Sequence, residues 1–192
     1  MKDQYYRTFI GIPFSVGEKV LAARQELIRS LKGERISWVK PDHFHVTLRF
    51  IGDTKVSEID RMIQALDTKV QRPERAKIKL IHLGSFGPRK KPRVVWVGFE
   101  KASLFRSLKT EVDAALDSCG IPVTDQPFTA HLTLGRIRDL KDLDGFYRVI
   151  GEMREDFRDQ VILDRLVFYR SELGSGGPVY TSLHELKFKD PA

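Results

Sequence analysis

The sequence predicts an α+β fold made of two related halves, and two observations support this class. First, the segment His45-Val46-Thr47-Leu48 returns as His131-Leu132-Thr133-Leu134, 86 residues later. Second, segments with strand-like and helix-like hydrophobic periodicity follow one another in the same order around both copies. Because element order and spacing repeat while residue identity mostly does not, we expect a bilobal, duplicated unit with largely antiparallel sheets, a pseudo-twofold axis and a central cleft.

The elements of the first half follow from their patterns. The apolar run Thr8–Phe14 is typical of a buried strand, and a helix is expected near Val16–Leu31 because its apolar residues form one stripe. The strand that starts at His45 comes next. A helix near Val56–Val70 and a strand at Ala76–Leu83 complete this half.

The second half repeats this order. A strand at Val94–Phe99 precedes a helix near Ser103–Cys119, whose apolar positions again fall on one face. After the second His-x-Thr-Leu strand, we expect a helix near Leu140–Phe157 and a strand at Val161–Tyr169.

The chain shows no break that would separate two domains. A last strand is expected at Val179–Phe188, after the turn-forming run Gly174-Ser175-Gly176-Gly177-Pro178. No low-complexity linker separates the halves, so we interpret residues 1–192 as one bilobed domain. Its repeat units span roughly residues 8–86 and 94–172, and we expect exchanged strands to close the lobes.

Composition and charge limit the classes of function. No apolar run reaches the roughly 18 residues of a membrane span. The one cysteine, Cys119, cannot form an intrachain disulfide, so we expect a cytoplasmic monomer with no membrane partner. Lys and Arg (33) outnumber Asp and Glu (26), which gives a net charge of +7. This excess favours a polyanionic partner such as nucleic acid, although it also fits a merely soluble basic protein.

The polar residues of the repeated motif share one face of each strand. Alternation places His45 with Thr47, and His131 with Thr133, opposite the apolar residues between them. Two such strands can bring both pairs to a common cleft. Two imidazoles suit in-line displacement at phosphorus, because one can take a proton from water while the other gives one to the leaving oxygen. The hydroxyls and the planar cation of Arg136 suit phosphate oxygens, so the scheme needs no metal or cofactor.

Simpler interpretations compete for the single histidines. A lone histidine on a half-buried strand is more often structural, and only the duplication favours catalysis. His43 precedes His45 by two residues, so a His-x-His metal site is conceivable, but no Asp, Glu or Cys stands near either motif in a ligand pattern. We assign His82, His184 and Cys119 to packing or to the surface.

The two motifs resemble the signature of the two-histidine (2H) phosphoesterase superfamily. Their surroundings are similar to segments of the RNA 2′,3′-cyclic phosphodiesterases, long called 2′-5′ RNA ligases, in which Ala often stands in place of Gly135. The similar segments are Arg7–Ile12, Trp38-Val39, His45–Gly52, Phe86, Arg93–Trp96, His131–Arg136, Tyr169–Leu173 and Gly177–Tyr180. The resemblance covers nearly the whole chain, with both motifs in register with their flanks.

The resemblance implies a bilobal α+β fold and an activity. Members open a terminal 2′,3′-cyclic phosphate to a 2′-phosphate without metal, and 2′-5′ ligation is the side activity. Carried over by motif, His45 and His131 are the catalytic pair, and Thr47, Thr133 and Arg136 contact the phosphate. By analogy His45 is the proton donor to the departing O3′ and His131 the proton acceptor from water, although the pseudo-symmetry makes the reverse assignment chemically reasonable.

Further residues are candidates for the cleft wall or for RNA contact. Phe86 can stack a base, and Tyr169 and Ser171 lie in a family-like segment. The basic run Arg89–Arg93 is either a solvated turn or a contact to RNA phosphates. The expected partner is RNA or a nucleotide with a 2′,3′-cyclic phosphate end. A phosphodiesterase for a small cyclic phosphate, of the ADP-ribose cyclic phosphate type, stays open, and so does a non-catalytic RNA-binding protein, which would have no use for matched acid–base groups.

Overall fold

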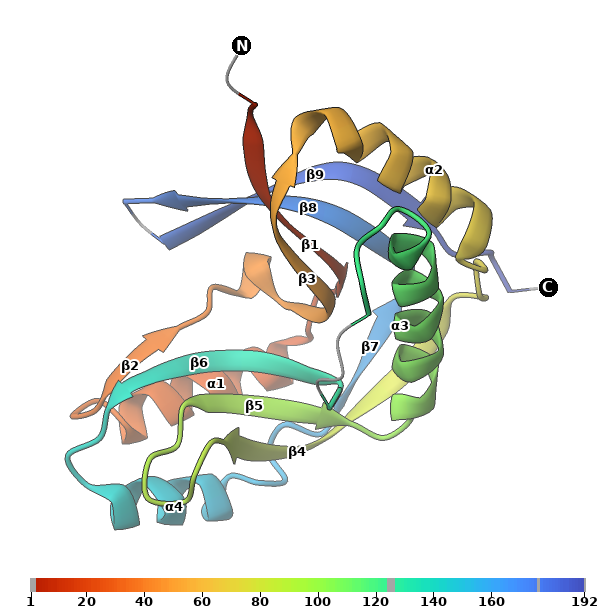
Figure 1. Cartoon of the computed structure of the whole chain (residues 1–192). Helices are drawn as coiled ribbons and strands as arrows, with labels where there is room; N and C mark the ends of the chain where they lie inside the picture. Colours follow the sequence, from red (N-terminus) through yellow and green to blue (C-terminus); the bar gives the residue numbers. More distant parts are fainter. Residues whose placement is uncertain (1–2, 124–126, 176, 192) are drawn as a thin grey trace.

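The computed structural model describes residues 3–123, 127–175 and 177–191 (Figure 1). The first half contains β1 (Tyr5–Pro13), α1 (Glu18–Ser30), β2 (Arg35–Trp38), η1 (Pro41–His43), β3 (His45–Lys55), η2 (Val56–Glu58), α2 (Ile59–Lys69) and β4 (Ala76–Phe86). The second half contains β5 (Val94–Phe99), α3 (Ala102–Asp117), β6 (His131–Asp139), α4 (Leu143–Glu152), β7 (Asp159–Leu163), β8 (Arg165–Gly174) and β9 (Gly177–Lys187).

The strands form two sheets, one in each lobe. The four-stranded sheet has the order β3-β1-β8-β9, and the five-stranded sheet has the order β2-β6-β5-β4-β7. Neighbouring strands in both sheets run antiparallel. The expected α+β class with largely antiparallel sheets is therefore confirmed. Among the helices that the structure describes, none is long and apolar enough to cross a membrane.

The two halves of the chain exchange strands. β4 from the first half pairs with β5, while β8 from the second half pairs with β1. The orders β3-β1-β8 and β6-β5-β4 are thus equivalent, each built from both halves. Helices follow the same rule, since α3 of the second half packs on β3 and against α2 (Figure 1). The assignment of residues 1–192 to one domain stays a prediction.

Two expected elements differ from the structure. The strand expected at Val161–Tyr169 is wrong, because the chain leaves one sheet with β7 and enters the other with β8. The apolar pattern continues on both sides of Asp164, so the sequence does not show where the chain changes sheet. In the structure Asp164 forms an ion pair with Arg165 at 3.0 Å. The helix expected near Leu140–Phe157 is shorter and spans only Leu143–Glu152. It begins after Asp142, because the Asp142 carboxylate accepts the Gly145 N–H and caps its start.

Two smaller points concern short segments. The edge strand β2 is not expected from the sequence, because four residues are too few to show a period. The turn-forming run 174–178 includes residue 176, which lies outside the described residues. The pairing of β8 with β9 extends to Gly174 and Gly177 on its two sides.

Gly135 lets β2 pack closely on β6. A Cβ at this position would lie 2.8 Å from Ile36 Cγ2 and 2.8 Å from Trp38 Cε3. We therefore expect Gly135→Ala to lower the free energy of unfolding by about 1–3 kcal/mol, as overpacking does. Urea unfolding measures this change.

The matched control for this substitution is Gly151 in α4, where a Cβ would meet nothing within 4 Å. Gly151→Ala should instead raise the free energy of unfolding by up to about 1 kcal/mol, because alanine is the better helix former. A Gly135→Ala protein as stable as the parent would show that Trp38 moves aside without cost.

Candidate active site

Both His-x-Thr motifs open a strand where the two sheets meet. His45 begins β3, His131 begins β6, and these two strands approach each other between the lobes (Figure 1). The apolar residues of the motifs are at most 3% exposed and anchor each strand on the core, whereas Thr47 and Thr133 are only partly buried. Burial on one face therefore turns the polar residues to the other.

Each of the two histidines makes an equivalent hydrogen bond to a backbone carbonyl two residues earlier in the chain. Nδ1 of His45 lies 2.7 Å from the carbonyl oxygen of His43, and Nδ1 of His131 lies 2.7 Å from that of Thr129. A carbonyl oxygen only accepts, so Nδ1 carries the proton in both rings. Nε2 is then left for chemistry on both sides. At His45 this atom lies 3.1 Å from Thr47 Oγ1, whose hydroxyl donates to it while the ring is neutral.

Burial and positive charge both favour neutral imidazoles. The pKa of His45 is lowered to about 4, mainly by burial. The hydrogen bond to the His43 carbonyl opposes this shift, and the charges of Arg136, His43 and His131 add to it. The pKa of His131 is also lowered, first by burial and then by Arg136. Since the charges of Arg136 and His131 on β6 reach His45 on β3, the two sheets contribute to one site.

An extra residue in β6, just before Arg136, determines which way the Arg136 side chain faces. Thr133 pairs with Trp96, but the next pair is Gly135 with Val95, so β6 bulges between them. Gly135 is therefore buried, and Arg136 is exposed. Its charge acts on both histidines. The structure thus brings the predicted phosphate contact Arg136 near the two histidines that we expect to be catalytic.

The same bulge follows the first motif and places a different residue at the equivalent position. Thr47 pairs with Gly11, and the next pair is Arg49 with Ile10. Phe50 then occupies the place of Arg136, and its side chain is 51% exposed with the Arg7 guanidinium 5.0 Å from its ring centre. The site is therefore symmetric in backbone and asymmetric in charge.

Aromatic rings line both histidines. Phe86 meets the His131 ring edge-on at 4.8 Å between centroids and stacks on Trp96 at 4.6 Å. Tyr169 stacks on Phe9 at 4.9 Å, and Phe9 lies 5.0 Å from the His45 ring. Two of the three predicted wall residues, Phe86 and Tyr169, thus stand beside opposite histidines.

The third predicted wall residue, Ser171, lies farther along β8. It pairs with Arg7 on one side and with Tyr180 on the other, whereas Tyr169 pairs with Phe9. Ser171 therefore belongs to the outer part of the same surface, two residues beyond the rings beside His45.

Tyr180 of β9 is a site residue that sequence reasoning missed. Its ring lies edge-on to His45 at 5.4 Å and 4.9 Å from the His43 ring. Burial raises the pKa of Tyr180, and the charge of Arg136 opposes this rise. The available signal was its place in a family-like segment, but only the pairing of β8 with β9 brings it to His45.

The remaining histidines and the cysteine have other surroundings. His82 lies edge-on to Trp96, and His184 Nε2 lies 3.0 Å from an Asp67 carboxylate oxygen. Cys119 is buried. His43, the conceivable metal ligand, supplies its carbonyl to His45, and no group of three or more His, Cys, Asp or Glu suited to a metal ion occurs in the described part of the chain.

The family model described as LigT-like phosphoesterase matches residues 10–96 and 99–180, which include both motifs. The chain belongs to the LigT-like phosphoesterase family. This confirms the resemblance seen in the motifs.

Among relatives of this LigT-like phosphoesterase are two proteins named RNA 2′,3′-cyclic phosphodiesterase. That of Aeropyrum pernix is 33% identical over 81% of this chain and 88% of its own, and that of Thermotoga maritima is 30% identical over 95% and 96%.

Solved structures show the same fold. The protein TT0787 of Thermus thermophilus superimposes with a TM-score of 0.74 at 24% identity, covering 97% of this LigT-like phosphoesterase and all of that protein. Escherichia coli LigT, crystallised with 3′-AMP, gives a TM-score of 0.71 at 18% identity and similar coverage, 97% and 100%. Both superpositions extend over both lobes.

Inorganic phosphate should raise the pKa of His45. An anion beside the ring favours the imidazolium and offsets the charge of Arg136, so the pKa should move up from about 4. NMR titration of the ring with and without phosphate measures the shift, and the His184 ring, set against Asp67, is the internal reference. If the pKa of His45 were the same with and without phosphate, phosphate would not bind beside this ring and the proposed site would be wrong.

The lowered pKa of His45 also makes stability depend on pH. Its unfolded value is about 6.5 and its folded value about 4, so the neutral ring contributes stability that is complete above pH 6.5 and is lost as the pH falls toward 4. Phosphate should reduce this loss.

Proposed function

We propose that this LigT-like phosphoesterase is a metal-independent RNA 2′,3′-cyclic phosphodiesterase that opens a terminal 2′,3′-cyclic phosphate to a 2′-phosphomonoester. The observation that carries the proposal is the matched pair of imidazoles, each fixed through Nδ1 and left with Nε2 for proton transfer. The relatives named RNA 2′,3′-cyclic phosphodiesterase support the same reaction.

In the proposed mechanism the two histidines act on opposite sides of phosphorus. Neutral His131 accepts a proton from water at Nε2 while the water oxygen forms a bond to phosphorus. The bond from phosphorus to O3′ breaks, and protonated His45 gives its Nε2 proton to O3′. The product carries a 2′-phosphate and a free 3′-hydroxyl, and exchange with solvent restores the two rings.

The phosphate contacts follow from the same arrangement. Arg136 neutralises the charge on the non-bridging oxygens, and the hydroxyls of Thr47 and Thr133 donate to them. Thr47 must turn its hydroxyl from His45 Nε2, 3.1 Å away, to the substrate. This exchange becomes favourable when the ring takes up its proton, because Nε2 is then a donor. The anionic substrate itself supplies the charge that raises the low pKa of His45.

The same geometry accounts for ligation as a side activity. If the 5′-hydroxyl of a second RNA replaces water, His131 deprotonates that hydroxyl and O3′ leaves as before. The product is then a 2′–5′ phosphodiester. Because one chain supplies both histidines, we propose a monomer, and the lone Cys119 fits a reducing cytoplasm.

Removing either catalytic imidazole should nearly abolish hydrolysis. We expect His45→Ala and His131→Ala each to lower kcat by about 10²–10⁴-fold, the usual contribution of a general acid or base. His184→Ala is the control, a strand histidine set against Asp67, and it should keep full activity. The assay follows a 2′,3′-cyclic-phosphate oligonucleotide in EDTA and identifies the position of the product phosphate. Turnover that depends on a divalent ion, or on neither histidine, would refute the mechanism.

A sulfur substitution should distinguish the acid from the base. With sulfur in place of O3′ the leaving thiolate, whose conjugate acid has a pKa near 8.5, departs without a proton. We expect this substrate to restore most activity to His45→Ala and none to His131→Ala. The reverse rescue would exchange the two roles and leave the reaction itself unchanged.

A further inference from the structure

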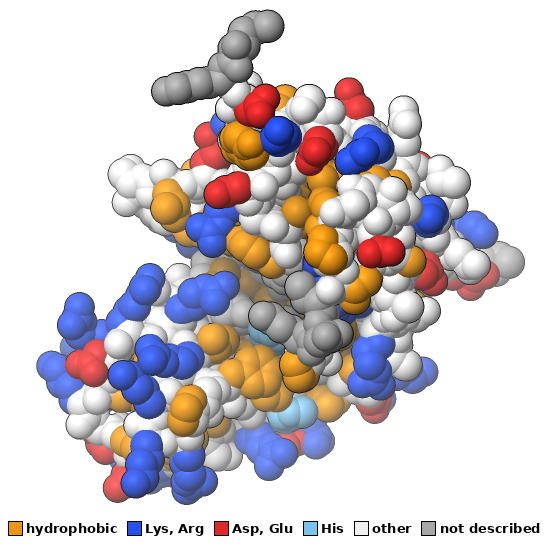
Figure 2. Space-filling model, viewed as in Figure 1, with side chains coloured by type: hydrophobic (Ala, Val, Ile, Leu, Met, Phe, Trp, Pro, Cys, Tyr) orange, Lys and Arg blue, Asp and Glu red, His pale blue; other side chains and the backbone are white. Residues whose placement is uncertain are grey.

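Basic side chains gather at the end of the five-stranded sheet away from the lobe junction. Figure 2 shows Lys and Arg over this part of the surface, where β2 begins and β6 ends in Figure 1. The exposed residues there include Lys90, Lys91 and Arg93 of the β4–β5 loop and Arg138 near the end of β6. These charges account for part of the basic excess, and the mechanism uses none of them.

The four cations line one cavity of about 230 Å³. Its apolar floor is formed by Pro92, Ile137, Leu140 and Leu143, and Asp139 is the carboxylate among its lining residues. Four positive charges therefore face one negative charge around a hollow wide enough for a phosphodiester group. Such a site is complementary to a polyanion.

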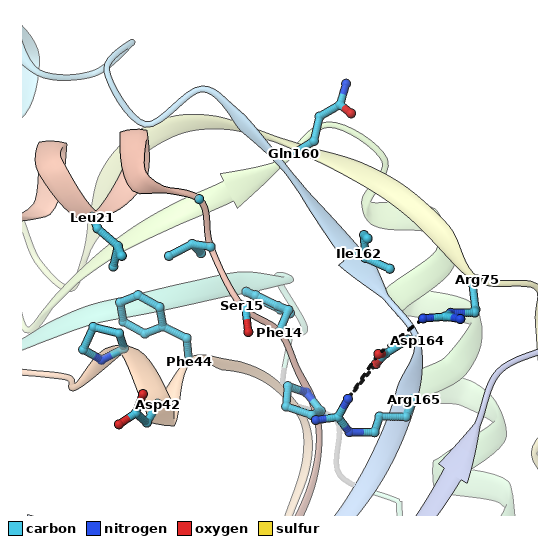
Figure 3. Close-up of a pocket in the computed structure, with 14 residues that line it drawn as sticks. Phe14, Ser15, Leu21, Asp42, Phe44, Arg75, Gln160, Ile162, Asp164 and Arg165 are labelled. Atoms are coloured by element: carbon cyan, nitrogen blue, oxygen red, sulfur yellow. Dashed lines mark hydrogen bonds and ion pairs between the residues drawn. The ribbon is translucent and has the colours of Figure 1, made fainter.

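A larger cavity of about 660 Å³ has a different electrostatic character. It lies between β1, η1 and β7, and Figure 3 shows that its cations Arg75 and Arg165 both point to Asp164. The distances are 3.9 and 3.0 Å. Asp42 adds a second carboxylate to its lining. Its charges are therefore balanced within the protein, which distinguishes it from the cavity beside Lys90.

The loop that carries the cations is held in one conformation. Lys91 N–H donates to Pro88 O, and Arg93 N–H donates to Phe86 O, both at 2.7 Å. Gly87 has φ of +111°, and a Cβ there would lie 3.0 Å from Arg93 N, so this turn needs glycine. Arg89 lies over the Tyr147 ring at 5.1 Å, outside the cavity. The backbone of this loop therefore does not have to become ordered when an anion binds.

β6 connects this cavity to the catalytic centre. It begins at His131, passes Arg136 and reaches Arg138, and both arginines are exposed. Arg138 lies two residues beyond Arg136, a step of about 7 Å, and the full span from His131 to Arg138 is about 20 Å. A stacked nucleic-acid strand rises about 3.4 Å per nucleotide, so this distance corresponds to about six nucleotides, or fewer if the strand is extended.

We propose that Lys90, Lys91, Arg93 and Arg138 bind the phosphodiester backbone of RNA upstream of the reacting end. The inference rests on the proposed function and specifies its substrate: an RNA strand of several nucleotides rather than a mononucleotide or a small cyclic phosphate. A mononucleotide whose one phosphate lies at the catalytic histidines and Arg136 has no second phosphate to offer this cavity. The backbone of a longer RNA reaches both.

The test compares substrates of increasing length. In the parent protein, KM should fall as a 2′,3′-cyclic-phosphate substrate grows from one to about six nucleotides, and then stay level. In the variant K90Q/K91Q/R93Q/R138Q, KM for the longest RNA should rise at least about tenfold. The dependence of log KM on log salt should weaken by about 0.7 for each lost contact. Its kcat and all constants for the mononucleotide should stay unchanged, because these contacts are made equally in the ground and transition states.

A matched control separates the site from net charge. K69Q/K77Q/K101Q/R106Q removes the same charge from exposed residues of α2, β4 and the α3 region and should leave KM unchanged. An equal rise of KM in both variants, or no length dependence in the parent, would overturn the proposal.

A binding measurement separates the failure of this inference from failure of the proposed function. Fluorescence anisotropy of a labelled hexanucleotide ending in a 2′-phosphate needs no turnover. If the parent hydrolyses nothing, the proposed function fails. RNA binding at the cavity is still supported if K90Q/K91Q/R93Q/R138Q binds the hexanucleotide at least about tenfold more weakly and the control variant does not. RNA binding there is rejected if K90Q/K91Q/R93Q/R138Q binds as tightly as the parent.

Discussion

The pairing of β4 with β5 and of β8 with β1 is the constraint on which the rest of the structure depends. Each strand leaves its own half of the chain and completes the sheet of the other half. The two halves of the chain are thus joined by backbone hydrogen bonds within each sheet. If each half closed on itself, nothing would hold β3 against β6, and the two histidines would have no fixed separation. The exchange also makes most strand contacts non-local in sequence, which slows folding in general.

Within this frame the site keeps its histidines neutral by burial. Burial lowers the pKa of His45 and His131, and Arg136 lowers both further. The free protein therefore has a permanent cation whose charge reaches two uncharged rings. In the proposed mechanism an anionic substrate pairs with that cation and at the same time makes protonation of a ring favourable. Binding of the substrate would therefore favour protonation of the histidine that acts as the acid. This fits a reaction that needs one ring charged and the other neutral.

The sequence predicts the site residues better than it predicts the path of the chain. The faces of His45 and Thr47 follow from the period of two, and duplication distinguishes these residues from an isolated histidine. The crossing from β7 to β8 could not be predicted, because apolar residues continue on both sides of Asp164 and local pattern carries no information about which sheet they join. Tyr180 was missed for the same reason. It lies 135 residues from His45 in the chain and meets it only through sheet order.

The position after each bulge explains how a symmetric backbone supports an asymmetric reaction. Phosphorus has one entering and one leaving oxygen, so two identical half-sites would give no preference for which ring holds the proton. The bulges place Arg136 in one half and Phe50 in the other at equivalent positions. The guanidinium of Arg136 and the phenyl ring of Phe50 therefore make the two sides of the phosphate different. Arg136 also stands on the strand that leads to the basic end of the sheet. The half that has the cation is thus the half from which the rest of a polyanionic strand would extend.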